Sequence, residues 1–234
     1  NNSIFIKILF FFKILLIPSK TFFSCRSTST FIAIFSLSSN GLKNAKSSKM
    51  IDKVIVSTDS VKILNICRKY GVDTPFLRKK FFGDKSPIHK ATLFSINQAE
   101  KYFGKFDIVV QLMPNCPFRT TKTINKCIKN FFNKKFDSQI SFSKPLFSNY
   151  WWAHRFINNR LKPINKKNLK KRSQDLENLY VPNGSIWISK ISKLKKKKSF
   201  YSDNYGHFFT NFIESIDIDN TEEFEFAESL KHEK

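Results

Sequence analysis

Asp217 and Asp219, near the C-terminus, are the residues whose types and spacing most directly suggest chemistry. They alternate with Ile216 and Ile218. On a strand, both carboxylates would therefore face one way while the isoleucines face the core. Two converging carboxylates repel each other unless a cation lies between them, and Mg²⁺ favours a few carboxylates together with substrate phosphates. An Asp-x-Asp pair beside a turn is also common on ordinary protein surfaces, so a magnesium site needs support from the rest of the chain.

Two apolar runs predict buried parallel strands that would bring further polar groups to such a site. Residues 52–59 end in Ser57-Thr58-Asp59, and residues 107–113 run into a loop that contains Asn115 and Arg119. Helical patterns at 61–70, 88–103 and 123–133 alternate with the strands, which is typical of an α/β fold. Ligands of open α/β sheets bind outside the carboxyl ends of the strands. The strand ends would then supply hydroxyls, an arginine and carboxylates, which is the outline of a phosphate-and-metal site.

The composition fits one α/β domain with an insertion, since 234 residues with 41% hydrophobic content can build a proper core. The formal net charge of +23 would suggest a nucleic-acid partner. We favour a bias in base composition as the cause of the excess lysine, because Lys, Asn, Ile and Phe are all abundant and all have A/T-rich codons. Four scattered cysteines form no CxxC pair and indicate reduced thiols in a cytoplasmic protein.

Residues 144–171 differ from their surroundings and predict an inserted arm. They are rich in aromatics, Asn and Lys, and Asn158-Asn159-Arg160 is typical of a turn between two strands of a hairpin. The adjacent Trp151 and Trp152 could form a protein interface or a local hydrophobic cluster, and base stacking ranks third. His154 is more readily structural than catalytic.

Residues 1–40 also differ from the rest, with no acidic residue and a single proline, Pro18. The apolar run from Ile4 to Ile17 is broken by Lys7 and Lys13, so it is too short and interrupted to predict a membrane span. No clear small-residue cleavage site follows it. We therefore expect no membrane partner.

Six short segments follow one another with ordinary spacing between residues 52 and 219. They are Asp52–Asp59 (DKVIVSTD), Pro75–Arg78 (PFLR), Gln111–Arg119 (QLMPNCPFR), Arg172–Leu176 (RSQDL), Pro182–Ile186 (PNGSI) and Ser215–Asp219 (SIDID). Each is weak alone. Together, over a stretch from about residue 42 to the end, the chain resembles the acylneuraminate cytidylyltransferases (CMP-N-acetylneuraminic acid synthetases).

This resemblance implies a Rossmann-like α/β nucleotidyltransferase fold. It has a mostly parallel sheet flanked by helices, in which Val54–Val56 and Ile108–Leu112 should be central. Residues 41–143 and 172–234 would form the cytidylyltransferase domain, and residues 144–171 would be an arm that pairs two copies into a homodimer. The implied reaction transfers CMP from CTP to a sialic-acid-like nonulosonic acid and releases pyrophosphate.

The resemblance also assigns roles to residues. Asp217 and Asp219 would bind Mg²⁺ and be catalytic, and Lys20 matches the family's catalytic lysine. The substrate-binding residues it implies are Asp59, Arg78, Asn115, Arg119, Arg172, Gln174 and Asn183. The residues Met113-Pro114-Asn115 are typical of a subgroup that acts on nonulosonates other than sialic acid.

The N-terminus departs from the family pattern. The family's glycine-rich basic loop cradles the CTP phosphates, but no glycine occurs here before Gly41, and Phe11 stands where the arginine is expected. Only Ile17-Pro18-Ser19-Lys20 remains, followed by Thr21 in place of Asn. We interpret residues 1–40 as a frameshifted remnant of the nucleotide-binding region, and we expect residues 5–40 to pack poorly.

Two other functions compete with the enzyme. One is an inactive family member that lacks the phosphate loop. The other is a basic protein that binds nucleic acid, which the Asp217/Asp219 pair disfavours because carboxylates repel phosphates unless a metal intervenes. The positive charge is also spread along the chain rather than gathered in one stripe.

Overall fold

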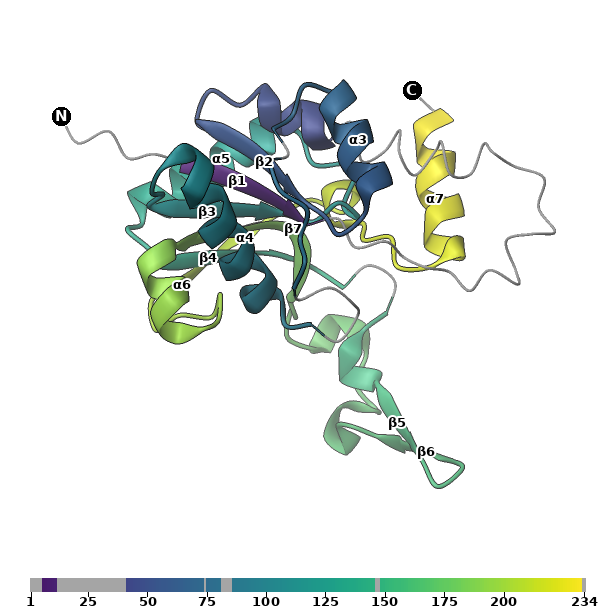
Figure 1. The fold of residues 1–234 in the computed structure, drawn as a ribbon. Helices are drawn as coiled ribbons and strands as arrows, with labels where there is room; N and C mark the ends of the chain where they lie inside the picture. Colours follow the sequence, from purple (N-terminus) through teal and green to yellow (C-terminus); the bar gives the residue numbers. More distant parts are fainter. Residues whose placement is uncertain (1–5, 12–40, 74, 81–85, 146–147, 233–234) are drawn as a thin grey trace.

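A mixed six-stranded sheet forms the centre of the computed structural model, which describes residues 6–11, 41–73, 75–80, 86–145 and 148–232 (Figure 1). The strand order is β2-β1-β3-β7-β4-β8. The strands are β1 (Ile6–Phe11), β2 (Lys53–Ser57), β3 (Ile108–Leu112), β4 (Ser138–Ser143), β7 (Val181–Lys190) and β8 (Tyr205–Phe209). Only β7 runs against the others, pairing antiparallel with both β3 and β4. The predicted α/β fold with a mostly parallel sheet is confirmed.

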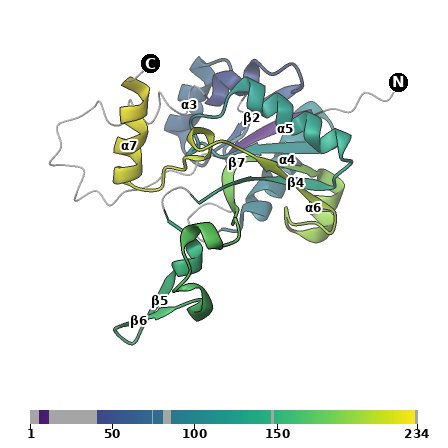
Figure 2. The same ribbon diagram turned by 180° about the vertical axis from the view of Figure 1, so that it is seen from behind.

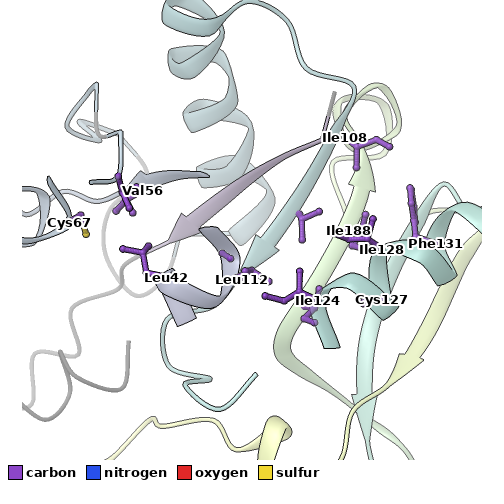
Figure 3. Close-up of a cluster of buried hydrophobic side chains, with 14 of the residues drawn as sticks. Leu42, Val56, Cys67, Ile108, Leu112, Ile124, Cys127, Ile128, Phe131 and Ile188 are labelled. Carbon is purple, nitrogen blue, oxygen red and sulfur yellow. The ribbon is translucent and has the colours of Figure 1, made fainter. Parts of the chain in front are cut away.

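Helices cover both faces of the sheet, as Figures 1 and 2 show from opposite sides. The labelled helices are α3 (Val61–Lys69), α4 (Ile88–Phe103), α5 (Thr121–Asn133), α6 (Ile191–Lys197) and α7 (Thr221–His232), and residues 41–46 are also helical. Alternate residues of β3 point to opposite layers: Ile108 and Val110 join a core with α3 and α5 (Figure 3), whereas Val109 joins a core with α4 and α6. All five residues of β3 are buried, which explains why all of them except Gln111 are apolar.

The prediction that residues 54–56 form a central strand is wrong, although the prediction for β3 is confirmed. Strand β2 lies at the end of the described sheet because β1 pairs between it and β3. Its apolar pattern has a different cause: Ile55 and Val56 are covered from the two faces by separate cores. On the side of β2 away from β1, Asp73 forms an isolated β-bridge with Ile55 and an ion pair with Lys53.

The expectation that residues 5–40 pack poorly is wrong for residues 6–11. These form β1, which pairs in parallel register on both sides, for example at Leu9 with Ile55 and with Gln111. A hexamer that is apolar except for Lys7 can supply this pairing whatever its origin, because backbone groups make the ladder bonds. The remainder of that segment, residue 5 and residues 12–40 with Lys20, lies outside the described residues.

The predicted hairpin is present as β5 (His154–Ile157) and β6 (Arg160–Pro163), which pair with each other apart from the main sheet. Asn158 and Asn159 connect them at φ values of 51° and 57°, the left-handed conformation that a two-residue hairpin turn requires and that Asn tolerates. The hairpin projects from the body of the molecule (Figures 1 and 2). None of the helices in the described part of the chain has the length and apolar character needed to cross a bilayer.

Candidate active site

Two loops meet at the carboxyl end of β3. The first loop follows β3 and carries Asn115, and the second leads into α7 and carries Asp217 and Asp219. The Ile218 amide donates to the Asn115 carbonyl at 2.9 Å, and the Asn115 side-chain amide donates to Asp219 Oδ1 at 3.2 Å. The Cys116 thiol lies 3.6 Å from Asp217 Oδ1. The structure therefore brings together three residues that the sequence nominated, Asn115, Asp217 and Asp219.

The aspartates lie on a loop and not on the strand for which the alternation was considered. The alternation expected of a strand survives nevertheless. Ile216 is buried, and with Ile218 it joins a small apolar cluster with Phe224 and Ala227 of α7. No neighbouring strand is needed, because α7 supplies the apolar surface that holds the isoleucines. The intervening carboxylates are left half-buried or exposed.

The start of α7 is fixed by reciprocal hydrogen bonds next to the aspartates. The Glu223 carboxylate accepts from the amides of Asp219 at 2.6 Å and Asn220 at 3.1 Å, while the Asn220 side chain accepts from the Glu223 amide at 2.9 Å. This is a capping box, which satisfies amides that a helix start leaves without partners. It also sets the point at which the aspartate loop turns into the helix.

Burial and like charge act together on Asp217. Burial raises the pKa of its carboxyl from 3.8 to about 6, with smaller contributions in the same direction from the Asp219 and Glu223 carboxylates, while the Cys116 thiol and Arg119 act against the rise. A cation would relieve this repulsion. No group of three or more His, Cys, Asp or Glu side chains that could hold a metal occurs among the described residues. Two carboxylates fit Mg²⁺, which takes its other ligands from water and phosphates.

Asn183, which was predicted to bind substrate, makes its described contacts within the protein. It is buried within β7, where its side-chain carbonyl accepts from Ser141 Oγ at 2.7 Å and from the Ser185 amide at 3.2 Å. Its amide nitrogen donates to Thr210 Oγ1 at 3.0 Å. The register between β4 and β7 shifts here, and Asn183 supplies the hydrogen bonds that the regular ladder loses.

Gly184, in the same irregularity, allows the loop after β3 to approach. Its carbonyl accepts from the Met113 amide at 3.2 Å. A Cβ atom at this position would lie 2.9 Å from Met113 Cγ and 3.2 Å from Cys116 Sγ. The Pro-Asn-Gly-Ser segment therefore supports the loop that carries Asn115.

Arg119, which was also predicted to bind substrate, likewise makes its described contacts within the protein. Its side chain is fully buried and donates to the main-chain carbonyls of Ser185, at 2.9 Å, and Met113. Burial lowers the pKa of the guanidinium to about 10, with Cys116 and Asp217 opposing the change. Arg119 thus ties the loop after β3 to β7 from inside.

The other predicted residues lie in two further places. Arg78 is buried at the end of β2, where its amide donates to the Thr58 carbonyl at 2.8 Å and the Asp59 carboxylate partly opposes the lowering of its pKa by burial. Arg172 and Gln174 are exposed on a short 3₁₀ segment, and Arg172 pairs with Asp175 at 2.9 Å. Neither place is joined to the aspartate loop by the contacts described here.

Sequence reasoning missed two residues that contact or support the aspartate loop. Cys116 touches Asp217, and its only sequence signal was its place beside Asn115. Glu214 is a buried carboxylate that receives hydrogen bonds from Thr120 and Thr123 at the start of α5. Its spacing three residues before Asp217 carried no signal by itself, because the two threonines it joins lie more than ninety residues away.

The chain is similar in sequence to proteins of known function. It is 30% identical over 199 residues to the CMP-N,N'-diacetyllegionaminic acid synthase of Legionella pneumophila, covering 80% of this chain and 81% of that one. It is 26% identical over 203 residues to a pseudaminic acid cytidylyltransferase of Campylobacter jejuni, covering 83% and 84%.

Solved structures agree on the fold. A CMP:2-keto-3-deoxy-manno-octonic acid synthetase complexed with CTP superposes with a TM-score of 0.60 at 9% identity, covering 98% of this chain and 99% of that one. A 4-diphosphocytidyl-2C-methyl-D-erythritol synthase from Anaerococcus prevotii gives 0.61 at 13% identity, covering 98% and 96%. The sequence profile described as "Cytidylyltransferase" matches residues 39–234. The chain belongs to the cytidylyltransferase family.

Proposed function

We propose that this chain transfers CMP from CTP to a nonulosonic acid and releases pyrophosphate. The observation that carries the proposal is the meeting of Asp217 and Asp219 with Asn115 at the carboxyl end of β3. Open α/β sheets bind their ligands at this edge. The names of the relatives, which refer to legionaminic, pseudaminic and neuraminic acids, supply the substrate class.

The residues have separate tasks in this reaction. The anomeric hydroxyl of the sugar acid attacks the α-phosphorus of CTP, and pyrophosphate leaves. Asp217 and Asp219 hold Mg²⁺, which neutralises charge on the phosphates when bound. Asn115 orients the Asp219 carboxylate through its side-chain amide. Lys20, outside the described residues, takes the α-phosphate in this proposal.

The projecting hairpin makes a homodimer part of the proposal. Phe156 is 69% exposed and Leu161 is 68% exposed, and every residue of β5 is exposed. Apolar side chains gathered on one projection favour a protein partner, and a second copy offers the same surface. Sedimentation should give a dimer at micromolar concentration, and Phe156→Glu with Leu161→Glu should give a monomer. A monomeric parent would contradict the dimer.

The cellular setting follows from the substrate. CTP is made and used in the cytoplasm, so we propose that the enzyme works there. Cys67, Cys116 and Cys127 are free and buried, in keeping with reduced thiols.

Pyrophosphate release tests the function. The chain is incubated with CTP, Mg²⁺ and legionaminic, pseudaminic or neuraminic acid, and we expect release with at least one sugar acid and none without it. The competing function is an inactive family member, suggested by the absence of glycine before Gly41. That protein would release no pyrophosphate with any of the three, even where the relatives do so under the same conditions.

A further inference from the structure

Glu214 is a buried carboxylate that the proposed chemistry does not use. It is 8% exposed and lies in the short 3₁₀ helix Ile213–Ser215, which leads directly into the aspartate loop. A buried carboxylate is costly unless several donors satisfy it. The donors that satisfy such a group therefore hold the surrounding segments in one arrangement.

The donors come from two parts of the chain. Thr120 Oγ1 donates to Glu214 Oε1 at 3.2 Å, and Thr123 Oγ1 donates to the same oxygen. The Asn211 side-chain amide donates to Oε2 at 3.1 Å, and Asn211 Oδ1 in turn accepts from the Glu214 amide at 2.8 Å. Thr120 is also the N-cap of α5 and accepts from the Thr123 amide at 3.1 Å. One carboxylate therefore joins the start of α5 to the start of the aspartate loop.

This junction lies between the two loops of the site. Helix α5 begins at Thr121, directly after the loop that carries Asn115 and Cys116, and the 3₁₀ helix ends at Ser215, two residues before Asp217. A negative charge at the amino end of a helix is also stabilised by the helix dipole. Fixing these two points fixes how the aspartates lie over Asn115 and Cys116.

We propose that Glu214 is a positioning residue, which holds the aspartate loop against the loop after β3 so that Asp217 and Asp219 are placed for the metal. The metal part of this inference rests on the proposed function. The positioning part rests only on the contacts of Glu214. A residue needed merely for stability would weaken the whole fold instead of this junction.

Thiol labelling separates the two roles without any turnover. Cys116 is fully buried against Asp217, whereas Cys67 and Cys127 are buried in the main core. In Glu214→Gln and Glu214→Ala, we expect iodoacetamide to label Cys116 about tenfold faster than in the parent, because a local opening equilibrium shifts by roughly that factor when a hydrogen bond to a charged group is lost. Peptide mass spectrometry should show Cys67 and Cys127 unchanged.

Two sets of matched variants control this test. Ser202→Ala removes another buried hydroxyl bond, the 2.8 Å contact with Ser138 at the first residue of β4, at the opposite end of the sheet from the site. In this variant, iodoacetamide should not label Cys116 faster relative to Cys67 and Cys127 than it does in the parent. Thr123→Val should behave like Glu214→Gln, whereas Thr123→Ser retains the hydroxyl and should restore protection.

The outcomes distinguish this inference from the function. Equal labelling of Cys67, Cys116 and Cys127, or no change at Cys116, would overturn the positioning role. If pyrophosphate is released, Glu214→Gln should raise the Mg²⁺ concentration for half-maximal rate about tenfold with little change in the KM for the sugar acid. An unchanged Mg²⁺ requirement would overturn the metal part. Selective labelling in a chain that releases no pyrophosphate would support the positioning role while the proposed function fails.

Discussion

Two polar segments that were both predicted to touch substrate are used in opposite ways. The Asn183–Ser185 irregularity of β7, with Arg119 against it, directs its polar groups inward. The Asp217–Asp219 loop, with Asn115 against it, keeps its carboxylates half-buried or exposed. Both segments contact the same loop after β3.

The difference lies in the hydrogen-bonding capacity that each group has left for a ligand. The Asn183 amide already makes three side-chain hydrogen bonds within the protein and has little capacity left. A carboxylate has two oxygens with about four acceptor sites. Asp219 accepts from Asn115, which leaves it able to take a cation as well.

The largest effect is expected at Arg119, on the supporting side. Arg119→Leu should lower the free energy of unfolding by about 3 to 5 kcal/mol, because two buried carbonyls lose their donors and an apolar side chain cannot replace them. Urea denaturation measures this. Arg119→Lys should recover only part of this stability, since an ammonium group cannot reproduce the planar fork of donors on a guanidinium. A fully stable Arg119→Lys protein that binds CTP poorly would show that Arg119 reaches substrate after all.

The opposite result is expected on the binding side. Asp219→Asn should lower kcat by about 10²-fold, as loss of one key electrostatic group does. Its stability should barely change, because the side chain is exposed. Pyrophosphate release and thermal unfolding together check this. Equal turnover of Asp219→Asn and its parent would remove the metal role from this aspartate.

The pH dependence of Asp217 sharpens the contrast further. Its folded pKa of about 6 lies above the usual 3.8, so the folded state binds more protons than the unfolded state between these values. Without metal, stability should therefore fall as pH rises from about 4 to 6, by up to about 3 kcal/mol. Asp217→Asn should lack this fall. A parent and variant whose stabilities change in parallel across this window would contradict the raised pKa.

The smallest effect is expected at Gly184. Gly184→Ala places a Cβ 2.9 Å from Met113 Cγ, which should cost about 1 to 3 kcal/mol as the loop after β3 shifts. Activity should fall as well, because Asn115 moves with the loop. Adding Met113→Ala removes the Met113 Cγ atom, which is nearest to the new Cβ, and should restore part of the stability and part of the activity. A Gly184→Ala protein with full stability and activity would show that the two segments are not coupled.

The sequence by itself determined the elements whose signals are local. The apolar run of β3, the paired asparagines of the hairpin turn and the alternation of Ile216 and Ile218 with two aspartates each depend on neighbours within a few residues. Strand pairing, turn conformation and the choice of buried face follow from such short patterns. The rule that ligands of open α/β sheets bind at the carboxyl ends of the strands placed Asn115 and the aspartate pair in one expected site.

Only the tertiary structure decided what depends on distant partners. The edge position of β2 follows from β1 pairing between it and β3. The inward use of Asn183 depends on Ser141 and Thr210, and that of Arg119 on the carbonyls of Met113 and Ser185. An Asn or Arg has the same donors and acceptors in either role. Burial and the groups that happen to surround it decide which role it takes, and those are fixed by chain segments far away in the sequence.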